Sequence, residues 1–270
     1  MIYARDKGRM CNNLLQFGHV YAFAREHGRR AISLRFAYKY PFFHISTTPG
    51  HNFFRYALVK YAAAAGLIPT VAFDSPGEDC EARAGEILSH RNVIVEGWEV
   101  RFYDLFLKYL DEIKSLFAFT SAIEKNVERV LARSEGRMRI GLHIRRGDYA
   151  RWQSGKYFYY DHQYIDVANR IIALYPGRDI TLIVTGNDPD LDREKFRNSI
   201  SGADVCFAEG SAGEDLCLLS RCDRLAGPPS TFSLVASMYH DVPLYWIKNP
   251  SAPISEDSFG HFTELFRHII

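Results

Sequence analysis

Residues 140–149 read IGLHIRRGDY, an apolar run that ends in two arginines, a glycine, an acid and a tyrosine. The run predicts a buried strand with charge at its carboxyl end, where ligands of open α/β sheets bind. Neighbouring strand residues point to opposite faces, so we expect Arg145 and Arg146 to have different tasks. The arginine fork suits a phosphate or diphosphate, and a surface ion pair is the alternative.

Apolar runs of strand length alternate with helical patterns along the whole chain, which predicts an α/β fold with parallel sheets. Strands are expected at 2–5, 31–34, 70–73, 92–97, 139–144, 180–185, 203–207, 223–226 and 242–246. Helices are expected at 14–27, 53–65, 81–89, 162–174, 190–200, 213–221 and 231–240. From residue 139 the alternation is that of a doubly wound, Rossmann-like sheet.

The polar stretch 133–137 separates two halves of this pattern. Apolar residues at helical spacing lead up to it from Asp111 to Ser134. We therefore predict a first domain over 1–136 and a second over 137–250. The last part, 251–270, is expected to be a helical tail that packs back on the first domain.

Composition excludes several classes of function. The 270 residues carry 33 Lys and Arg against 32 acids, so no overall charge favours nucleic acid as a partner. Five cysteines without metal spacing indicate reduced thiols. The sequence lacks a signal peptide pattern and an apolar window of about 20 residues. A cytoplasmic location is the expectation, and peripheral membrane contact stays open.

Four more segments place polar residues between a strand and a helix. Asn12 follows the first predicted strand, where it is either a helix N-cap or a ligand contact. Asp188 and Asp190 follow the strand 180–185; they favour a helix start and imitate a DxD metal motif. Asp215 begins the helix 213–221. The last segment starts the helix 231–240 with hydroxyls suited to a phosphate, at Ser230, Thr231 and Ser233.

The segment HIRRGDY resembles the H-x-R-R-x-D motif of α1,2-, α1,6- and protein O-fucosyltransferases, most closely those of glycosyltransferase family 11. Four further segments are similar to the family pattern in the same order: GRMCNNLLQF, VIVEGW with the following FY, EDLCLLSRC and PSTFS. The segment TGNDP resembles the TDDP motif of these enzymes. The chain departs from the pattern at Cys11, Asn13, Pro229 and the pair Leu234-Val235.

The resemblance implies two Rossmann-like halves facing across a cleft, the GT-B type. It implies an inverting fucosyltransferase that moves L-fucose from GDP-β-L-fucose to a glycan hydroxyl, with an α1,2 linkage expected and without metal or cofactor. Arg145 would neutralise the leaving diphosphate, Asp148 is the available general base, and Asn12 would approach from the first domain. The donor would be bound by His143, Arg146, Asp188, Asp215, Ser230, Thr231, Phe232 and Ser233, with Asp215 selecting the guanine.

Two alternatives follow from the same residues. Cys11 and the missing tryptophans are compatible with a sugar-nucleotide-binding protein without transferase activity. An NAD-type dehydrogenase is disfavoured because no G-x-G-x-x-G follows the first strand of either half. The acceptor, an oligosaccharide or a lipid-linked glycan, is not determined by the sequence, and neither are the general base and the oligomeric state.

Overall fold

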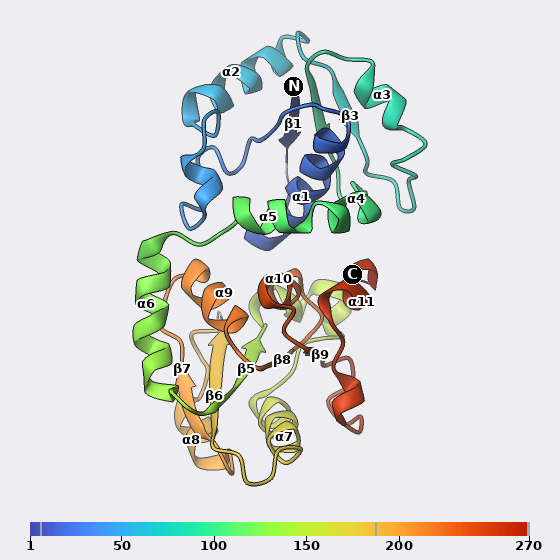
Figure 1. The fold of residues 1–270 in the computed structure, drawn as a ribbon. Helices are drawn as coiled ribbons and strands as arrows, with labels where there is room; N and C mark the ends of the chain where they lie inside the picture. The colour runs from blue at the N-terminus through green and yellow to red at the C-terminus, as the bar shows by residue number, and fades with distance from the viewer. Residues whose placement is uncertain (6, 187, 269–270) are drawn as a thin grey trace. The chain divides into compact units, whose positions relative to one another are not determined.

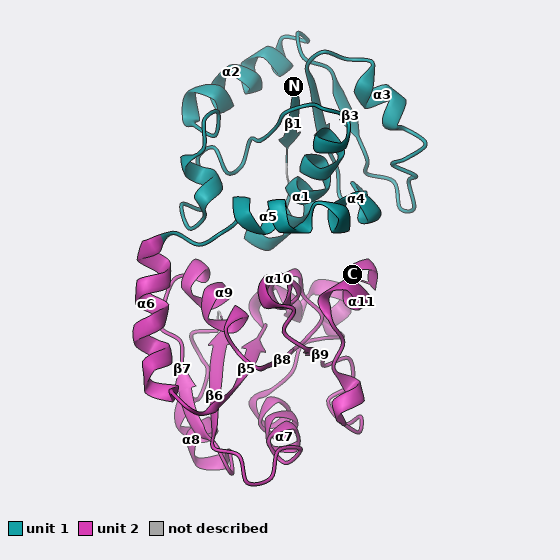
Figure 2. Ribbon diagram, in the orientation of Figure 1, with its two compact units in different colours: residues 1–120 teal, residues 121–270 magenta. Residues whose placement is uncertain are grey.

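The computed structural model describes residues 1–5, 7–186 and 188–268. It divides into two compact units, residues 1–120 and 121–270 (Figure 2). Each unit contains a parallel β-sheet with helices (Figure 1). The predicted fold class, α/β with two Rossmann-like halves, is confirmed for each unit taken by itself.

The sheet of unit 1 is parallel, with the strand order β2-β1-β4-β3. Its strands are β1 (Ile2–Arg5), β2 (Ala31–Ser33), β3 (Thr70–Ala72) and β4 (Val93–Glu96). Tyr3 on β1 pairs with Ile32 on β2 and with Ile94 on β4. The unbroken apolar run at the start of β4 is buried, as expected for a parallel strand covered on both faces.

The helices of unit 1 are α1 (Met10–Glu26), α2 (Phe53–Ala64), α3 (Ala84–Leu88), α4 (Tyr103–Lys108) and α5 (Leu110–Leu116). Almost all of α1 is buried, and it packs closely on α4. Gly18 permits this packing, because a Cβ there would lie 2.3 Å from the ring of Phe106. Glycine is therefore used here for close approach rather than for flexibility.

The sheet of unit 2 is parallel, with the order β7-β6-β5-β8-β9. Its strands are β5 (Met138–Ile144), β6 (Ile180–Gly186), β7 (Asp204–Phe207), β8 (Arg224–Gly227) and β9 (Leu244–Trp246). The chain proceeds from β5 outward to β7, then returns to the other side of β5 to form β8 and β9. The carboxyl ends of β5 and β8 therefore flank the topological switch point, where open α/β sheets bind ligands.

The helices of unit 2 are α6 (Ser121–Leu131), α7 (Asp161–Ile172), α8 (Arg193–Ser199), α9 (Ala212–Ser220), α10 (Thr231–His240) and α11 (Phe262–Leu265). Leu142 on β5 belongs to a core cluster with Tyr164 and Val167 of α7. Gly141 points the other way, and a Cβ there would lie 2.7 Å from Leu219 of α9. The strand that ends in the arginines is thus covered on both faces.

The boundary between the units lies earlier than the sequence predicts, at Thr120 instead of residue 136. The expected helix from Asp111 to Ser134 is interrupted between α5 and α6, because Phe119 forms an antiparallel bridge with Phe43. Helix α6 belongs to unit 2 and packs on α9, where Asn126 donates a hydrogen bond of 2.7 Å to Glu214.

The C-terminal tail, 251–270, also differs from the prediction. Its described part contains short 3₁₀ turns and α11 instead of one long helix. It packs within unit 2, where Gly260 bridges Leu244 of β9 and Glu256 pairs with Arg224. The two last residues, 269 and 270, lie outside the described part of the chain.

Candidate functional site

The carboxyl ends of β5 and β8 meet closely at the switch point of unit 2. A Cβ at Gly227 would lie 2.8 Å from the carbonyl oxygen of His143, so only glycine lets the two strand ends approach in this way. Helix α10 begins just beyond β8. The ring of His143 stacks on that of Phe232, with centroids 4.8 Å apart and planes at 19°. Two of the predicted donor-binding residues are therefore in contact.

His143 is a buried, neutral imidazole with one unused nitrogen. Its exposed fraction is 5%, and Nδ1 lies 3.3 Å from Oγ1 of Thr185. Burial, and then the nearby charge of Arg145, lower the pKa of His143 to about 3. Nε2 is buried and has no hydrogen-bond partner among the described residues. A buried polar atom left unpaired costs about 1–3 kcal/mol, so this nitrogen is poised for a ligand.

The amino terminus of α10 supplies the hydroxyls that the sequence predicts. Ser230 is the N-cap, and its Oγ accepts a hydrogen bond of 3.2 Å from the backbone N–H of Ser233. The two serine hydroxyls are 3.0 Å apart, and both residues are buried. Thr231 and Phe232 are partly exposed. The amino-terminal end of a helix, with its dipole and first-turn N–H groups, favours an anion.

A tyrosine that the sequence analysis did not single out ties the two loops together. The Tyr149 hydroxyl, just after β5, donates a hydrogen bond of 2.5 Å to the carbonyl of Pro229, just before α10. A proline at position 229 is compatible with this bond, because only its carbonyl takes part. No local pattern marks Tyr149 for this role, since its partner is far away in the sequence.

Arg145 stands beside these groups with its own counter-ion. Its Nη2 lies 2.9 Å and 3.0 Å from the two carboxylate oxygens of Asp148. The guanidinium carbon lies 5.3 Å from the centre of the Tyr149 ring. Asp148, the predicted general base, is thus first of all the ion-pair partner of Arg145. The fork has five donors, so the remaining ones can face a diphosphate.

Arg146 has a different environment from Arg145, as expected, although both lie beyond the end of β5 at Ile144, so strand alternation is not the cause. Its side chain is 11% exposed and pairs with Asp161 and, at 2.7 Å, with Asp188. Nε donates to the carbonyl of Tyr159 at 2.9 Å. The guanidinium therefore joins the end of β5 to the start of α7 and to the loop after β6. This arrangement gives Arg146 and Asp188 a positioning role, and a direct contact of either with the donor stays a prediction.

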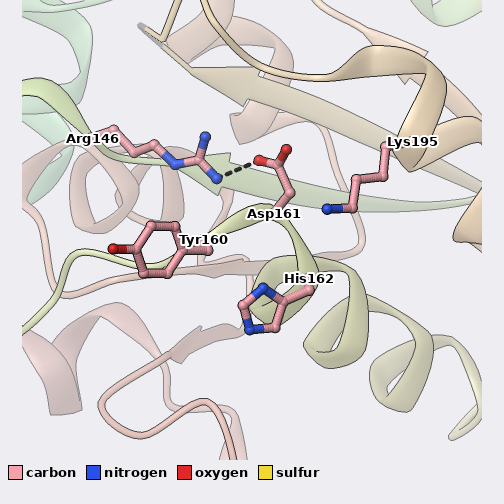
Figure 3. A pocket seen from close by; sticks show the side chains of 5 residues that line it. All are labelled: Arg146, Tyr160, Asp161, His162 and Lys195. Atoms are coloured by element: carbon pink, nitrogen blue, oxygen red, sulfur yellow. Dashed lines mark hydrogen bonds and ion pairs between the residues drawn. The ribbon is translucent and has the colours of Figure 1, made fainter.

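The ion pair of Arg146 lines a pocket of about 400 Å³. Figure 3 shows the guanidinium directed at the carboxylate of Asp161, with Tyr160, His162 and Lys195 around the same space. Asp161 was missed by the sequence analysis. Its only signal is that of an acid in the first turn of a helix, which is common at any helix start.

Asp215 lies in another pocket, of about 220 Å³, that α9 and α6 line together. Oδ1 of Asp215 is buried and has no hydrogen-bond partner among the described residues. Burial, and then the charge of Glu214, raise the pKa of Asp215 to about 7. Glu214 is held in a capping box with Ser211, where it accepts the Ser211 N–H at 2.6 Å. None of the described residues that line this pocket is one of the residues that surround His143.

The first loop of unit 1 differs from the sequence prediction. Helix α1 begins at Met10 rather than Leu14, so Cys11 lies inside the helix and is buried. The positive φ needed for the turn, +86°, occurs at Gly8. Asn12 lies close to Gly8, where a Cβ would be 2.6 Å from its Nδ2. The cysteine thus demands no unusual backbone, and the role of Asn12 in transfer stays a prediction.

No metal cluster is built from the described side chains: none of their groups brings together three His, Cys, Asp or Glu residues in suitable positions. Asp188 is occupied by protein groups, because Oδ2 pairs with Arg146 and Oδ1 accepts the N–H of Asp190 at 3.0 Å. The predicted helix start there lies further on, where Asp192 caps α8. Asn187 is outside the described residues, and independence from metal stays a prediction.

Comparisons with known proteins agree with this arrangement. The profile of glycosyl transferase family 11 matches residues 97–242, more than half of the chain. POFUT1 in complex with GDP-fucose is 12% identical, with a TM-score of 0.57 over 89% of this chain and 94% of that one. Fucosyltransferase NodZ from Bradyrhizobium is 15% identical, with a TM-score of 0.55 over 93% and 96%. At such identities the solved structures share the fold. No curated protein matches the sequence.

Proposed function

Because the chain belongs to glycosyl transferase family 11 and is thus a glycosyltransferase, we propose that it transfers L-fucose from GDP-β-L-fucose to a glycan hydroxyl, with inversion. The observation that carries the proposal is the meeting of three groups at the switch point of unit 2. These are Arg145, the unpartnered Nε2 of His143 and the amino terminus of α10. The POFUT1 and NodZ structures with GDP-fucose support the choice of donor.

The diphosphate would be held between Arg145 and the start of α10. As the bond to fucose breaks, negative charge builds up on the β-phosphate oxygens, and donors already placed there stabilise it. The N–H groups and hydroxyls of Ser230, Thr231 and Ser233 provide such donors, and Arg145 adds a charge-assisted fork. With the diphosphate held in this way the reaction would need no metal, in line with the expectation that the enzyme works without one.

The guanosine would be read by His143 and Asp215. An ionised carboxylate can accept the guanine N1–H and the exocyclic amine together, and Asp215 has an unpaired oxygen available. The neutral imidazole of His143 offers Nε2 for a hydrogen bond, while Phe232 fixes its ring from one side. Arg146 and Asp188 would support this half of the site by holding the loops after β5 and β6.

Deprotonation of the acceptor is assigned to Asp148, with Asn12 approaching the donor or acceptor. The Asp148 carboxylate is already ion-paired with Arg145, so an acceptor hydroxyl would have to share its oxygens with that guanidinium. Departure of GDP ahead of strong attack by the acceptor would ease the demand on the base. We propose an α1,2 linkage to an oligosaccharide or a lipid-linked glycan, the second of which would bring the enzyme to a membrane surface.

The test is turnover of GDP-fucose by the purified full chain with galactose-terminated oligosaccharides as acceptors. We expect GDP release to match formation of a fucosylated product, with an α-linked fucose by NMR. Excess chelator should leave the rate unchanged. Tight binding of GDP-fucose without turnover on any acceptor would instead favour the binding protein without transferase activity.

A further inference from the structure

Helix α2 of unit 1 has two apolar faces, of which the sheet covers only one. Tyr56, Val59 and Ala63 face the sheet, in a cluster with residues of β1, β2 and β4. Of the residues in α2, Val59 is the one that is buried. The other face carries large apolar side chains that nothing in the described chain covers. Helix α2 flanks the sheet of unit 1 (Figure 1).

The uncovered face forms a continuous stripe. Phe54, Leu58 and Tyr61 are 85%, 67% and 70% exposed, and their spacing of four and three residues places them on one side of a helix. Phe53, in the first turn of α2, and Leu67, beyond its end, are also exposed. We call Phe54, Leu58 and Tyr61 the α2 stripe. Contiguous exposed apolar surface of this kind marks an interaction site.

All charged residues in the stretch of sequence that contains α2 are positive. Residues 27–73 contain no Asp or Glu, whereas the whole chain has almost equal numbers of acids and bases. The cations of this acid-free segment are Arg29, Arg30, Arg35, Lys39, Arg55 and Lys60. The charged residues of α2 itself, Arg55 and Lys60, are both positive, and an apolar stripe on such a helix is complementary to an anionic, partly apolar surface.

A pocket of about 210 Å³ lies on the other side of α2, at the carboxyl ends of β1 and β2. Three cations line it, Arg5, Arg35 and Lys60, together with Tyr38 and Tyr56. Arg5 is paired with Glu96, so the pocket is not purely cationic. Arg35 donates a hydrogen bond of 2.9 Å to the hydroxyl of Tyr38. Cationic and hydroxyl donors around such a space suit a phosphate group.

Lys60 connects the pocket to the stripe. Its Nζ lies 5.9 Å from the ring centres of both Tyr56, in the pocket, and Tyr61, in the stripe. A free phosphate would use the pocket but leave the stripe exposed, and a neutral apolar partner would leave the cations unmatched. A lipid surface satisfies both features at once.

We propose that α2 is an interfacial helix that docks the protein on a membrane containing anionic phospholipids. The α2 stripe enters the boundary between headgroups and acyl chains, while Arg55 and Lys60 contact lipid phosphates. Among the helices that the structure describes, none has the length and apolar character of a membrane span. Membrane docking is proposed independently of the transferase activity. Only the idea that docking brings the enzyme to a lipid-linked acceptor rests on the proposed function.

Co-sedimentation of the full chain with vesicles tests the proposal. We expect binding to phosphatidylcholine vesicles that contain phosphatidylglycerol, weaker binding to phosphatidylcholine alone, and release by salt. The double variant Phe54→Ser, Leu58→Ser should lose most of the binding. Arg55→Glu should weaken it by more than roughly fivefold, the effect of one cation near such a surface.

Matched controls come from unit 2. Lys125→Glu makes the same charge change on an exposed position of α6, and Tyr160→Ser removes an exposed aromatic ring; both should bind vesicles like wild type. Arg55 is half-buried and the other substituted residues are exposed, so thermal unfolding should confirm that each variant is folded.

Four outcomes would overturn the proposal. One is wild-type protein that sediments with neither kind of vesicle, and a second is a Phe54→Ser, Leu58→Ser variant that binds as well as wild type. Another is a lipid-free dimer that the same substitutions dissociate, which would identify a second copy as the occupant. The last is saturable binding of inorganic pyrophosphate without vesicle binding. None of these assays contains GDP-fucose, so their failure is separate from failure of the transferase proposal.

Discussion

The imidazole of His143 lies flat against the ring of Phe232, at a centroid distance of 4.8 Å. The contact joins the end of β5 to the first turn of α10, two segments that the sequence separates by a whole series of strands and helices. It holds Nδ1 toward Thr185 and leaves Nε2 buried, without a hydrogen-bond partner in the part of the chain that the structure describes. A donor site with one side chain already oriented loses less entropy when the ligand binds.

Arg145→Ala should weaken GDP binding about 10- to 100-fold. A charge-assisted hydrogen bond to a phosphate contributes about 1.5–3 kcal/mol, and 1.4 kcal/mol corresponds to tenfold in affinity. Isothermal titration calorimetry measures the change, with the unfolding midpoint as a check on the fold. Arg145→Lys keeps the charge but not the fork, so its affinity for GDP should lie between those of the wild type and of Arg145→Ala. Unchanged affinity in the alanine variant would remove Arg145 from the site.

Arg146→Ala should instead destabilise the fold. Its removal leaves the carboxylates of Asp161 and Asp188 poorly exposed and without a counter-ion, which costs about 3–5 kcal/mol. Urea denaturation measures the loss. Replacing all three residues, as Arg146→Met, Asp161→Asn, Asp188→Asn, should recover part of it. A variant with wild-type stability that fails to bind GDP would show that Arg146 contacts the donor directly.

GDP affinity should decrease as the pH falls below about 7. Burial raises the pKa of Asp215 to about 7, so the free protein takes up a proton there as the pH drops. Reading guanine requires the ionised form, hence binding releases that proton, and the dissociation constant should rise about tenfold per pH unit. Asp215→Asn should flatten this dependence and reduce the preference for GDP over IDP, which lacks the exocyclic amine. A wild-type profile in Asp215→Asn would contradict the assignment.

The folded protein should lose stability between pH about 6.5 and 4. Burial lowers the pKa of His19 and His143 to about 3 and that of His51 to about 4. These histidines become protonated near pH 6.5 in the unfolded chain but not in the folded one, so falling pH favours unfolding. Each histidine should lower the free energy of unfolding by about 1.4 kcal/mol for each pH unit.

Ring nitrogens of two of these histidines accept backbone hydrogen bonds, which protonation would break. His19 Nδ1 accepts the N–H of Phe102 at 3.0 Å, and His51 Nε2 accepts that of Ser33 at 3.1 Å. Denaturation curves across this pH range measure the slope. His19→Gln retains an acceptor that does not titrate and should reduce the slope by one proton; an equal slope would exclude His19 as a contributor.

Most strands and helices could be predicted because their signals are local. The apolar runs at β1 and β5 and the serine cap before α10 each lie within a few residues. The break between α5 and α6 could not be predicted in this way. It depends on Phe119 bridging Phe43, a pairing of segments far apart in the sequence that outweighs helical periodicity.

The candidate site shows the same division. Periodicity and residue chemistry alone indicated that the charged end of β5 and the hydroxyls before α10 face a phosphate, and that adjacent arginines differ. Only the folded chain decided which acids neutralise Arg146, that burial raises the pKa of Asp215 to about 7, and that Nε2 of His143 has no hydrogen-bond partner among the described residues. Hydrogen-bonding capacity belongs to each residue type, whereas ion pairing and desolvation depend on which distant groups the fold brings within a few ångströms.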